Sequence, residues 1–150
     1  LTQIITVIDT DAPTLLGVPA NITVQCDDVP TAATPTFSDS CDTNVEIVLV
    51  ETSTKSGDVD SCDNYSYTIT RIWTATDACL NSSRLTQTIT VIDTDAPTLL
   101  GVPANITVQC DDVPTAATPT FSDSCDTNVE INLVETSTKS GDIESCESDR

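Results

Sequence analysis

Residues 67–92 read YTITRIWTATDACLNSSRLTQTITVI, and this stretch decides the fold. Apolar and polar residues alternate on both sides of a short polar turn, with Ile69, Trp73 and Ala75 on one side of the first half. A period of two is the pattern of a half-buried β-strand, and β-branched and aromatic residues suit a pleated surface. We therefore expect strands at Tyr65–Thr76 and Leu85–Ile92, with Trp73 as the anchor of the core.

Shorter segments of the same kind lie upstream and are separated by turn-rich stretches such as DDVPT and SDSCDT. Short strands at this spacing, with no helical period between them, are typical of an all-β sandwich. The three further strands that we expect are Ala20–Cys26, Ala33–Ser38 and Val45–Thr52.

An internal repeat dominates the organisation of the chain. Residues 1–62 recur as residues 85–146, and the copies differ only at Ile4/Thr88, Val48/Asn132, Val59/Ile143 and Asp60/Glu144. Near-identical copies are typical of stalks and filaments, which gain reach from repetition, and enzymes rarely need them.

The alternation also predicts which side chains face the core. Val48 should face water, because its counterpart in the second copy is Asn132. Arg71 shares a face with core residues, so we expect it at a sheet edge with its guanidinium reaching an acid. The inward-facing residues of the flanking strands are predicted to be Val45, Ile47, Leu49, Leu85, Ile89 and Val91.

Composition restricts the function. Five Lys+Arg against 24 Asp+Glu give a net charge of -19, which repels nucleic acid and anionic membranes and suits divalent cations. The chain has no histidine, so a Ser-His-Asp or Cys-His nucleophile cannot be built. No stretch is long enough to insert into a membrane. We expect a non-catalytic protein.

Cysteine usage indicates the compartment. Seven cysteines without a CxxC pair and without histidine favour disulfides over zinc. Disulfides persist in oxidising surroundings, so a secreted protein, extracellular or at the cell surface, is expected.

The stretch Tyr67–Asn81 (YTITRIWTATDACLN), followed by Leu85–Pro97 (LTQTITVIDTDAP), resembles the HYR-like (hyalin-repeat-like) repeats of large bacterial surface proteins. Such repeats are common in Bacteroidetes adhesins. The resemblance implies Ig-like or fibronectin-III-like sandwiches arranged end to end, often in adhesion. The sequence departs from that family at Leu80, where glycine is usual, and it lacks two cysteines that many such repeats carry.

Domain limits follow from the repeat and the resemblance. Residues 1–9 are predicted to be the last strand of a preceding repeat, and residues 10–94 one complete repeat. Residues 95–150 are predicted to be the first part of the next repeat, without its last two strands.

Acidic turns supply the candidate metal ligands. The linker Asp9–Pro13 (DTDAP) recurs as Asp93–Pro97 and resembles the calcium linkers of cadherin-type arrays. In an Ig topology, Asp39, Asp42 and Asp77 gather near the first linker, at the end where the chain enters the repeat, and Asp27, Asp28, Asp58 and Asp60 gather near the second, at the end where it leaves. Ca²⁺ would find the oxygen ligands it needs at each end. The alternative is that aspartate makes turns and keeps the chain soluble. The predicted ligands are Asp9, Asp11, Asp27, Asp28, Asp39, Asp42, Asp77, Asp93, Asp95, Asp123 and Asp126.

Cysteine pairing follows from the same Ig topology. Cys26 and Cys62 should lie at the end where the chain leaves the repeat, and Cys41 and Cys79 at the end where it enters. We therefore predict the bonds Cys26–Cys62 and Cys41–Cys79. By the same argument, Cys110 pairs with Cys146, and Cys125 waits for a partner beyond Arg150. The rival pairing is Cys26–Cys41 with Cys62–Cys79, and it would join Cys110 to Cys125.

Two further patterns concern modification and surface binding. N-x-S/T sequons, which are glycosylation acceptors where the host has the machinery, begin at Asn21, Asn64, Asn81 and Asn105. Threonines of neighbouring strands can carry O-linked sugars or bind ice, although ordinary β-propensity also explains them. The threonines concerned are Thr68, Thr70, Thr86 and Thr88.

The function that these observations favour is mechanical. We expect a structural repeat of an extracellular adhesin stalk or filament, stapled by disulfides and stiffened by calcium at the junctions between repeats. Its partners would be neighbouring repeats of the same chain or copies of itself. The alternative is a surface module that binds a glycan, a protein or ice through its loops.

Overall fold

The computed structural model describes residues 1–138, which divide into two units, one of residues Leu1–Asp95 and one that begins at Ala96. The described residues are all-β apart from one short 3-10 helix, η1 (Cys62–Asn64). This composition and the sheets described below are consistent with an Ig-like fold. Each unit is described by itself.

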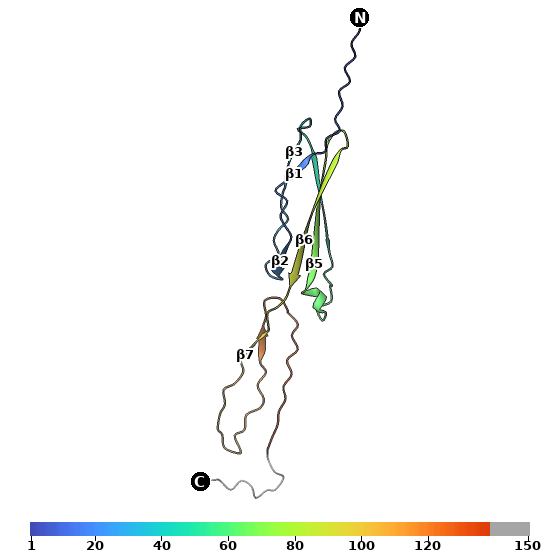
Figure 1. Cartoon of the computed structure of the whole chain (residues 1–150). Coiled ribbons are helices and arrows are strands. Elements are labelled where there is room, and N and C mark those ends of the chain that lie inside the picture. The colour runs from blue at the N-terminus through green and yellow to red at the C-terminus, as the bar shows by residue number, and fades with distance from the viewer. Residues whose placement is uncertain (139–150) are drawn as a thin grey trace. The chain divides into compact units, whose positions relative to one another are not determined.

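A four-stranded sheet forms the larger layer of the first unit, in the order β2-β6-β5-β4. The long strands β5 (Tyr67–Thr76) and β6 (Ser82–Ile92) pair antiparallel at its centre (Figure 1). Strand β4 (Glu46–Ser53) pairs antiparallel with β5, and β2 (Ile22–Gln25) pairs parallel with β6. The β5–β6 hairpin is therefore the frame on which the outer strands are added.

A two-stranded sheet forms the second layer. Strands β1 (Thr14–Leu16) and β3 (Thr36–Ser38) pair antiparallel, with Leu15 opposite Phe37. Leu15 packs against Trp73 and Ala75 of β5, so the small sheet covers one half of the large one. The two layers together make a sandwich.

A polar layer divides the core into two apolar clusters. One cluster contains Leu15, Trp73 and Ala75, and the other contains Ile69, Ile89 and Val91. Between them, in register on β4, β5 and β6, lie Glu51, Arg71 and Gln87.

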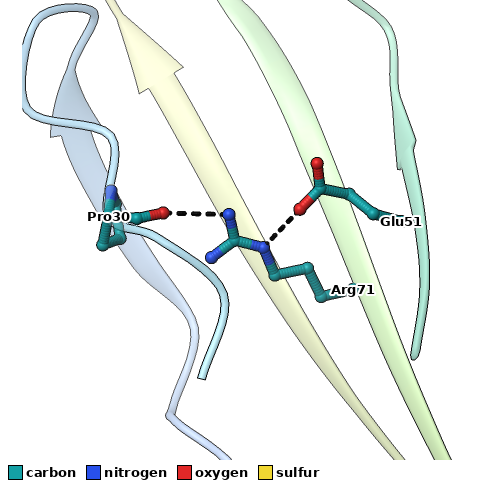
Figure 2. A network of polar contacts seen from close by, with 3 residues as sticks. All are labelled: Pro30, Glu51 and Arg71. Carbon is teal, nitrogen blue, oxygen red and sulfur yellow. Dashed lines mark hydrogen bonds and ion pairs between the residues drawn. The ribbon is translucent and has the colours of Figure 1, made fainter. Parts of the chain in front are cut away.

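Arg71 is the centre of this polar layer (Figure 2). Its side chain is only 5% exposed, and its Nε donates to Glu51 Oε2 at 2.6 Å. Its Nη2 donates to the carbonyl oxygen of Pro30 at 2.9 Å, which attaches the β2–β3 loop to the sheet. Gln87 Nε2 likewise donates to the carbonyl oxygen of Ala20 at 3.0 Å. The core thus holds two loop segments by side-chain hydrogen bonds.

The predicted core faces are largely confirmed. Trp73, Ala75, Ile89 and Val91 are buried, and Val45 and Ile47 pack against the first cluster. Val48 is exposed, as predicted from its counterpart Asn132.

Three of these predictions are wrong, and the first concerns Leu49, which is 39% exposed. Leu85 is 45% exposed, because β2 pairs with β6 only from Ile89 onward and leaves the first half of β6 as an uncovered edge. Arg71 does reach an acid, but it lies on the central strand β5 rather than at a sheet edge. Its desolvation is offset there by Glu51 and by the carbonyl group of Pro30.

Strand boundaries differ from those predicted mainly near the start of the repeat. The segment expected at Ala20–Cys26 is shorter, and the short strand β1 before it was missed. Strand β6 begins at Ser82 rather than at Leu85, because Ser82 and Ser83 continue the pairing with Thr76 and Ala75.

The turn between β5 and β6 contains a left-handed residue. Leu80 has φ 71°, and its side chain is 82% exposed. Its N–H donates to the carbonyl oxygen of Asp77 at 3.2 Å, and the N–H of Asp77 donates to that of Asn81 at 3.1 Å. Because a Cβ is unfavourable at this φ, glycine would fit this turn with less strain than leucine.

The second unit contains one strand pair. Strands β7 (Thr98–Leu100) and β8 (Thr120–Ser122) pair with Leu99 opposite Phe121, which is the register of β1 and β3. Within residues 96–138, no strand corresponds to β2, β4, β5 or β6.

Candidate functional site

A cluster of polar contacts lies where the β3–β4 loop meets the β5–β6 turn, which we call the entry end. Asp42 of the loop accepts a hydrogen bond at 2.8 Å from the backbone N–H of Ala78 in the turn. Two segments far apart in the sequence are therefore joined by one carboxylate.

Within the loop, aspartates act first as caps of the backbone. Asp39 Oδ1 accepts from the N–H groups of Cys41 and Asp42, both at 2.9 Å. Asp42 Oδ1 accepts from the N–H of Asn44 at 2.8 Å. These short-range bonds are the ordinary turn chemistry of aspartate.

The same bonds keep Asp42 ionised. Hydrogen bonds from the backbone N–H groups of Asn44 and Ala78 lower the pKa of Asp42, because they stabilise the carboxylate form. The second unit repeats the loop, and N–H groups of Asp126 and Cys125 lower the pKa of Asp123 in the same way. Asp126 accepts from Asn128 at 2.7 Å, as Asp42 does from Asn44.

The turn and the preceding linker contribute three more carboxylates. Asp77 is 4% exposed, and its two oxygens accept from the backbone N–H and the side-chain amide of Asn81, both at 2.8 Å. The amide of Asn81 also reaches the carbonyl oxygen of Asp9 at 3.4 Å. Asp11 Oδ2 accepts from the hydroxyl of Ser40 at 3.3 Å. Asn81 and Ser40 therefore tie the linker to the two loops.

The structure brings the five predicted entry-end acids into one neighbourhood, but it does not bring them into a single coordination shell. In the described part of the first unit, no three of them place ligand atoms within 4.8 Å of one another. Among the described residues, Asp39 Oδ2 is a buried oxygen without a hydrogen-bond partner.

The acids at the opposite end of the first unit, the exit end, are arranged differently. Asp27 and Asp28 follow β2, and the linker residues Asp93 and Asp95 follow β6, which runs parallel to β2. Gln25 joins the two segments, because its amide donates to the hydroxyl of Thr94 at 2.5 Å. The N–H of Asp95 donates to Asp93 Oδ1 at 3.1 Å, which repeats the contact of Asp11 with Asp9.

Cysteines occupy both ends. Cys41 and Cys79 are exposed free thiols on the two loops that Asp42 joins. The pKa of the Cys79 thiol is raised, first by loss of solvation and then by the negative charges of Asp9, Asp77 and Asp42 and by Cys41. Cys79 therefore lies within electrostatic range of Cys41 and of three acids.

The predicted disulfides are not the ones in this structure. Cys62 and Cys110 carry free thiols, as do Cys41 and Cys79, whereas Cys26 and Cys125 are disulfide-bonded. The bonds Cys26–Cys62 and Cys41–Cys79 are therefore absent here, and Cys125 does not wait for a partner. Cys146 lies outside the described residues.

The sheet order explains why Cys26 and Cys62 do not meet. Strand β6 lies between β2, which precedes Cys26, and β5, which follows η1. Two strand spacings separate β2 from β5 by roughly 10 Å, and disulfide-bonded Cα atoms lie at most about 7 Å apart.

The outward face of the large sheet carries the predicted threonines. Thr68 lies opposite Thr90 and Thr70 opposite Thr88, whereas Thr86 lies opposite Ile72. A shallow groove of about 220 Å³ on this face is lined by Asn21, Ile22, Thr23, Thr88 and Thr90.

The sequons differ in accessibility. Asn21 and Asn105 are exposed, although Asn21 Oδ1 accepts from the N–H of Thr88 at 2.7 Å. Asn64 is half-buried within η1. Asn81 is half-buried and its amide is used by the turn, so a sugar on Asn81 would break the turn.

Sequence reasoning missed the residues that connect these segments. Ser40, Asn81 and Gln25 each bridge two chain segments, and Gln87 holds the backbone before β2. Gln87 could have been found, because its place in the alternation puts an amide on the core face, where it must find a partner.

Comparison with known proteins identifies the first unit. A family model described as the HYR-like domain with 4 cysteines matches residues 15–91. No curated protein and no solved structure matches the chain. HYR-like domains are typically extracellular, adhesion-type modules, and the described part of the chain has no helix long and apolar enough to cross a membrane. With the match spanning half of the sequence and four cysteines at Cys26, Cys41, Cys62 and Cys79, the chain belongs to the HYR-like domains with four cysteines.

Proposed function

We propose that the chain is part of the stalk or filament of an extracellular, bacterial-type adhesin, in which its repeats act as spacers. The observation that carries this proposal is the repetition of residues 1–62 as residues 85–146 with four differences. Repeats that bind ligands through their loops usually diverge in those loops. The repeats of a spacer stay alike, because each unit has the same mechanical role.

The fold supports a mechanical, non-catalytic role. The large sheet is stabilised by long antiparallel pairing between β4, β5 and β6, and its loops are tied down by Arg71 and Asp42. The chain contains no histidine for nucleophilic or acid–base chemistry. The family to which it belongs is adhesion-type and extracellular.

Ca²⁺ is the cofactor that we propose for the junctions between repeats. At the entry end, Asp9, Asp11, Asp39, Asp42 and Asp77 lie on segments joined by Asn81, Ser40 and Ala78. Carboxylates held this close repel one another, and a hard cation that accepts about six to eight oxygens would offset the repulsion. The buried, unpartnered Asp39 Oδ2 is a candidate ligand.

Solution scattering of the 150-residue chain tests the spacer role. A compact globule of 150 residues has a radius of gyration of about 15 Å, and an end-to-end arrangement of two units must exceed it clearly. The proposal expects a rod-like distance distribution. A value near 15 Å would contradict it.

Thermal unfolding with and without Ca²⁺ tests the cofactor. We expect Ca²⁺ to raise the midpoint of the first unit, because a ligand that binds only the folded state stabilises it. Asp11→Asn removes a charge from the linker, and the Asp11 side chain accepts its hydrogen bond from Ser40 and not from the backbone. This substitution should therefore reduce the rise in midpoint that Ca²⁺ causes. Asp63→Asn removes a charge from η1, away from the linker, and should leave the shift unchanged. No Ca²⁺ effect on the wild-type chain would exclude calcium but not the spacer role.

A ligand-binding module is the second candidate function. The groove at Asn21, Thr23, Thr88 and Thr90 and the threonine rows beside it are the observations that favour it. Screening the chain against a glycan array and in an ice-recrystallisation assay separates the two candidates. Binding that is lost in Thr88→Ile, the residue found at position 4 of the first copy, would favour the module over the spacer.

A further inference from the structure

We propose that the contact between the first and the last strands of the repeat is its force-bearing element, which resists shear when the two ends of the repeat are pulled apart. We call this contact the terminal seam, and it consists of residues 13–25 and 83–94. The proposal rests on the spacer function, because only a repeat under tension makes use of such an element. It adds to that function the bonds that must break before the repeat extends.

The terminal seam is built around a parallel strand pair. Strands β2 and β6 pair from Ile22 opposite Ile89 to Gln25 opposite Ile92, and all other strand pairs of the described residues are antiparallel. Tension reaches β2 from the start of the repeat and leaves β6 at its end. In a parallel pair loaded in this way one strand is pulled along the other, so the bonds of the ladder resist together. An antiparallel hairpin pulled at its two ends opens one bond after another.

Side chains continue the seam directly beyond both ends of the β2–β6 ladder. Before it, Asn21 Oδ1 accepts from the backbone N–H of Thr88 at 2.7 Å. After it, the Gln25 amide donates to the hydroxyl of Thr94 at 2.5 Å and accepts from the N–H of Thr94 at 3.4 Å. The backbone on both sides of the short ladder is therefore held in the same parallel alignment.

Two more contacts extend the seam toward the start of the repeat. Gln87 Nε2 donates to the carbonyl oxygen of Ala20 at 3.0 Å, and the hydroxyl of Ser83 donates to the carbonyl oxygen of Pro13. Gln87 is 2% exposed and Pro13 is also fully buried, so both contacts are shielded from water. The start of the repeat is thus attached along most of the length of β6.

The core protects one face of the seam. Ile89 and Val91 of β6 are 0% and 1% exposed, and Val24 of β2 packs against them. Sliding β2 along β6 would expose these apolar side chains while the hydrogen bonds break. Shear of the seam therefore meets hydrogen bonding and apolar packing at the same time.

The repeat keeps the residues of the seam. Residues 13–25 recur without change as 97–109. Residues 87–94 and their counterparts 3–10 differ only at Thr88/Ile4, and Thr88 bonds to Asn21 through its backbone N–H. The one difference between the copies thus leaves every side chain that bonds within the seam unchanged.

Force-clamp spectroscopy of the full 150-residue chain, held between two folded handle domains, tests the proposal. A reducing agent keeps the cysteines as thiols, so no disulfide shortens the released chain. Extension of residues 13–94 should add roughly 250 Å, at about 3.3–3.6 Å per residue less the folded length, and this step identifies the first unit. The unfolding rate of that step at a fixed force is the quantity compared between variants.

Asn21→Ala and Gln25→Ala each remove side-chain hydrogen bonds from the seam. Each should raise the unfolding rate at fixed force by about fivefold, because the seam is already broken in the transition state and the whole loss falls on the folded state. Thr54→Ala is the matched control. Thr54 Oγ1 also accepts from a strand N–H, that of Thr68 at 2.9 Å, but it lies beside β4 at the opposite edge of the sheet. This variant should lose similar stability in urea titration and keep the wild-type unfolding rate under force.

Two results would overturn the proposal. One is a wild-type rate under force for both seam variants, with their loss of stability in urea confirmed. The other is a rise in Thr54→Ala as large as in the seam variants. Either result would leave the spacer role standing, since solution scattering tests that role separately, and a compact scattering profile would remove the spacer role without changing the forced-unfolding rates.

Discussion

Two copies of one sequence have different burial in this molecule. Leu15 is 6% exposed in the first unit, and its counterpart Leu99 is 54% exposed in the second. Ile22 and its counterpart Ile106 are 37% and 66% exposed. The short sheet is nevertheless kept, since β1–β3 and β7–β8 pair in the same register. The difference must come from what surrounds each copy.

The segment Leu1–Asp9 also differs from its counterpart, because only one of the two copies forms a strand. Its sequence is that of 85–93 except for Ile4, yet it forms no strand, whereas 85–92 lies within β6. Ile5 is 75% exposed and its counterpart Ile89 is fully buried. In the first unit Ile89 has β5 on one side and β2 on the other, and Leu1–Asp9 has neither neighbour.

These comparisons assign different roles to the strands. The β1–β3 pair forms from its own residues, but β2 and β4 become strands only where the β5–β6 hairpin is present. Strand β5 occurs once in the sequence and supplies Trp73, Arg71 and Ile69 to the core. We conclude that β5 and β6 organise the repeat.

The largest effect is expected from Trp73→Ala. Trp73 is 1% exposed and supports Leu15 across the sandwich, so its removal should cost about 3–5 kcal/mol of the free energy of unfolding. Val48→Ala, an exposed position of the same sheet, should cost less than about 0.5 kcal/mol. Urea titration of both variants measures the difference. Similar losses would mean that β5 does not anchor the core.

A smaller effect is expected from Arg71→Met. This change keeps the apolar stem but leaves the carbonyl group of Pro30 and the carboxylate of Glu51 without their donor. It should cost about 1–3 kcal/mol. Glu51→Gln should cost less than about 1 kcal/mol, because Glu51 is 46% exposed. If both substitutions cost the same free energy of unfolding, the ion pair with Glu51, and not the hydrogen bond to Pro30, would account for the stabilisation.

The entry-end contact should depend on pH. Because the folded pKa of Asp42 lies below its ordinary value of 3.8, its carboxylate stabilises the folded loop above about pH 4. That contribution is lost as the pH falls through the lowered pKa. The amide resonance of Ala78, which donates to Asp42, should shift with this titration in NMR spectra. The shift should vanish in Asp42→Asn, and its persistence there would assign the titration to another acid.

The smallest effect is expected at the β5–β6 turn. Leu80 has φ 71° and an exposed side chain, so Leu80→Gly relieves backbone strain without losing packing. It should stabilise the first unit by about 0.5–1 kcal/mol, whereas Leu80→Ala keeps the Cβ and should give no gain. Destabilisation by glycine would show that the side chain contributes a contact.

The sequence alone predicted the parts of the fold that depend on alternation. The β5 and β6 strands, the buried Trp73 and the exposed Val48 all follow from a period of two, which holds wherever one sheet face is buried. Strand β1 was missed because three residues are too few to show a period. The central position of Arg71 was missed because strand order depends on tertiary pairing.

For the candidate site, the sequence predicted which acids lie near one another but not which residues connect them. Turn residues indicated correctly that Asp42 and Asp77 lie near one another at the entry end. Alternation and spacing carry no information on bridging residues such as Asn81 or Ser40, because a polar residue in a turn has many possible partners. The cysteine pairs were chosen by which end of the sandwich each residue occupies, and that choice ignored the strand that separates Cys26 from Cys62.

Amide hydrogen exchange of Val24 and Val108, resolved by NMR in the 150-residue chain, tests most directly the claim that β5 and β6 organise the repeat. The two valines occupy identical sequence surroundings, but Val24 lies in β2 beside β6, whereas no described strand contains Val108. We expect the β2 amides paired with β6 to exchange far more slowly than their counterparts in residues 106–109. Equal protection of the two copies would contradict it.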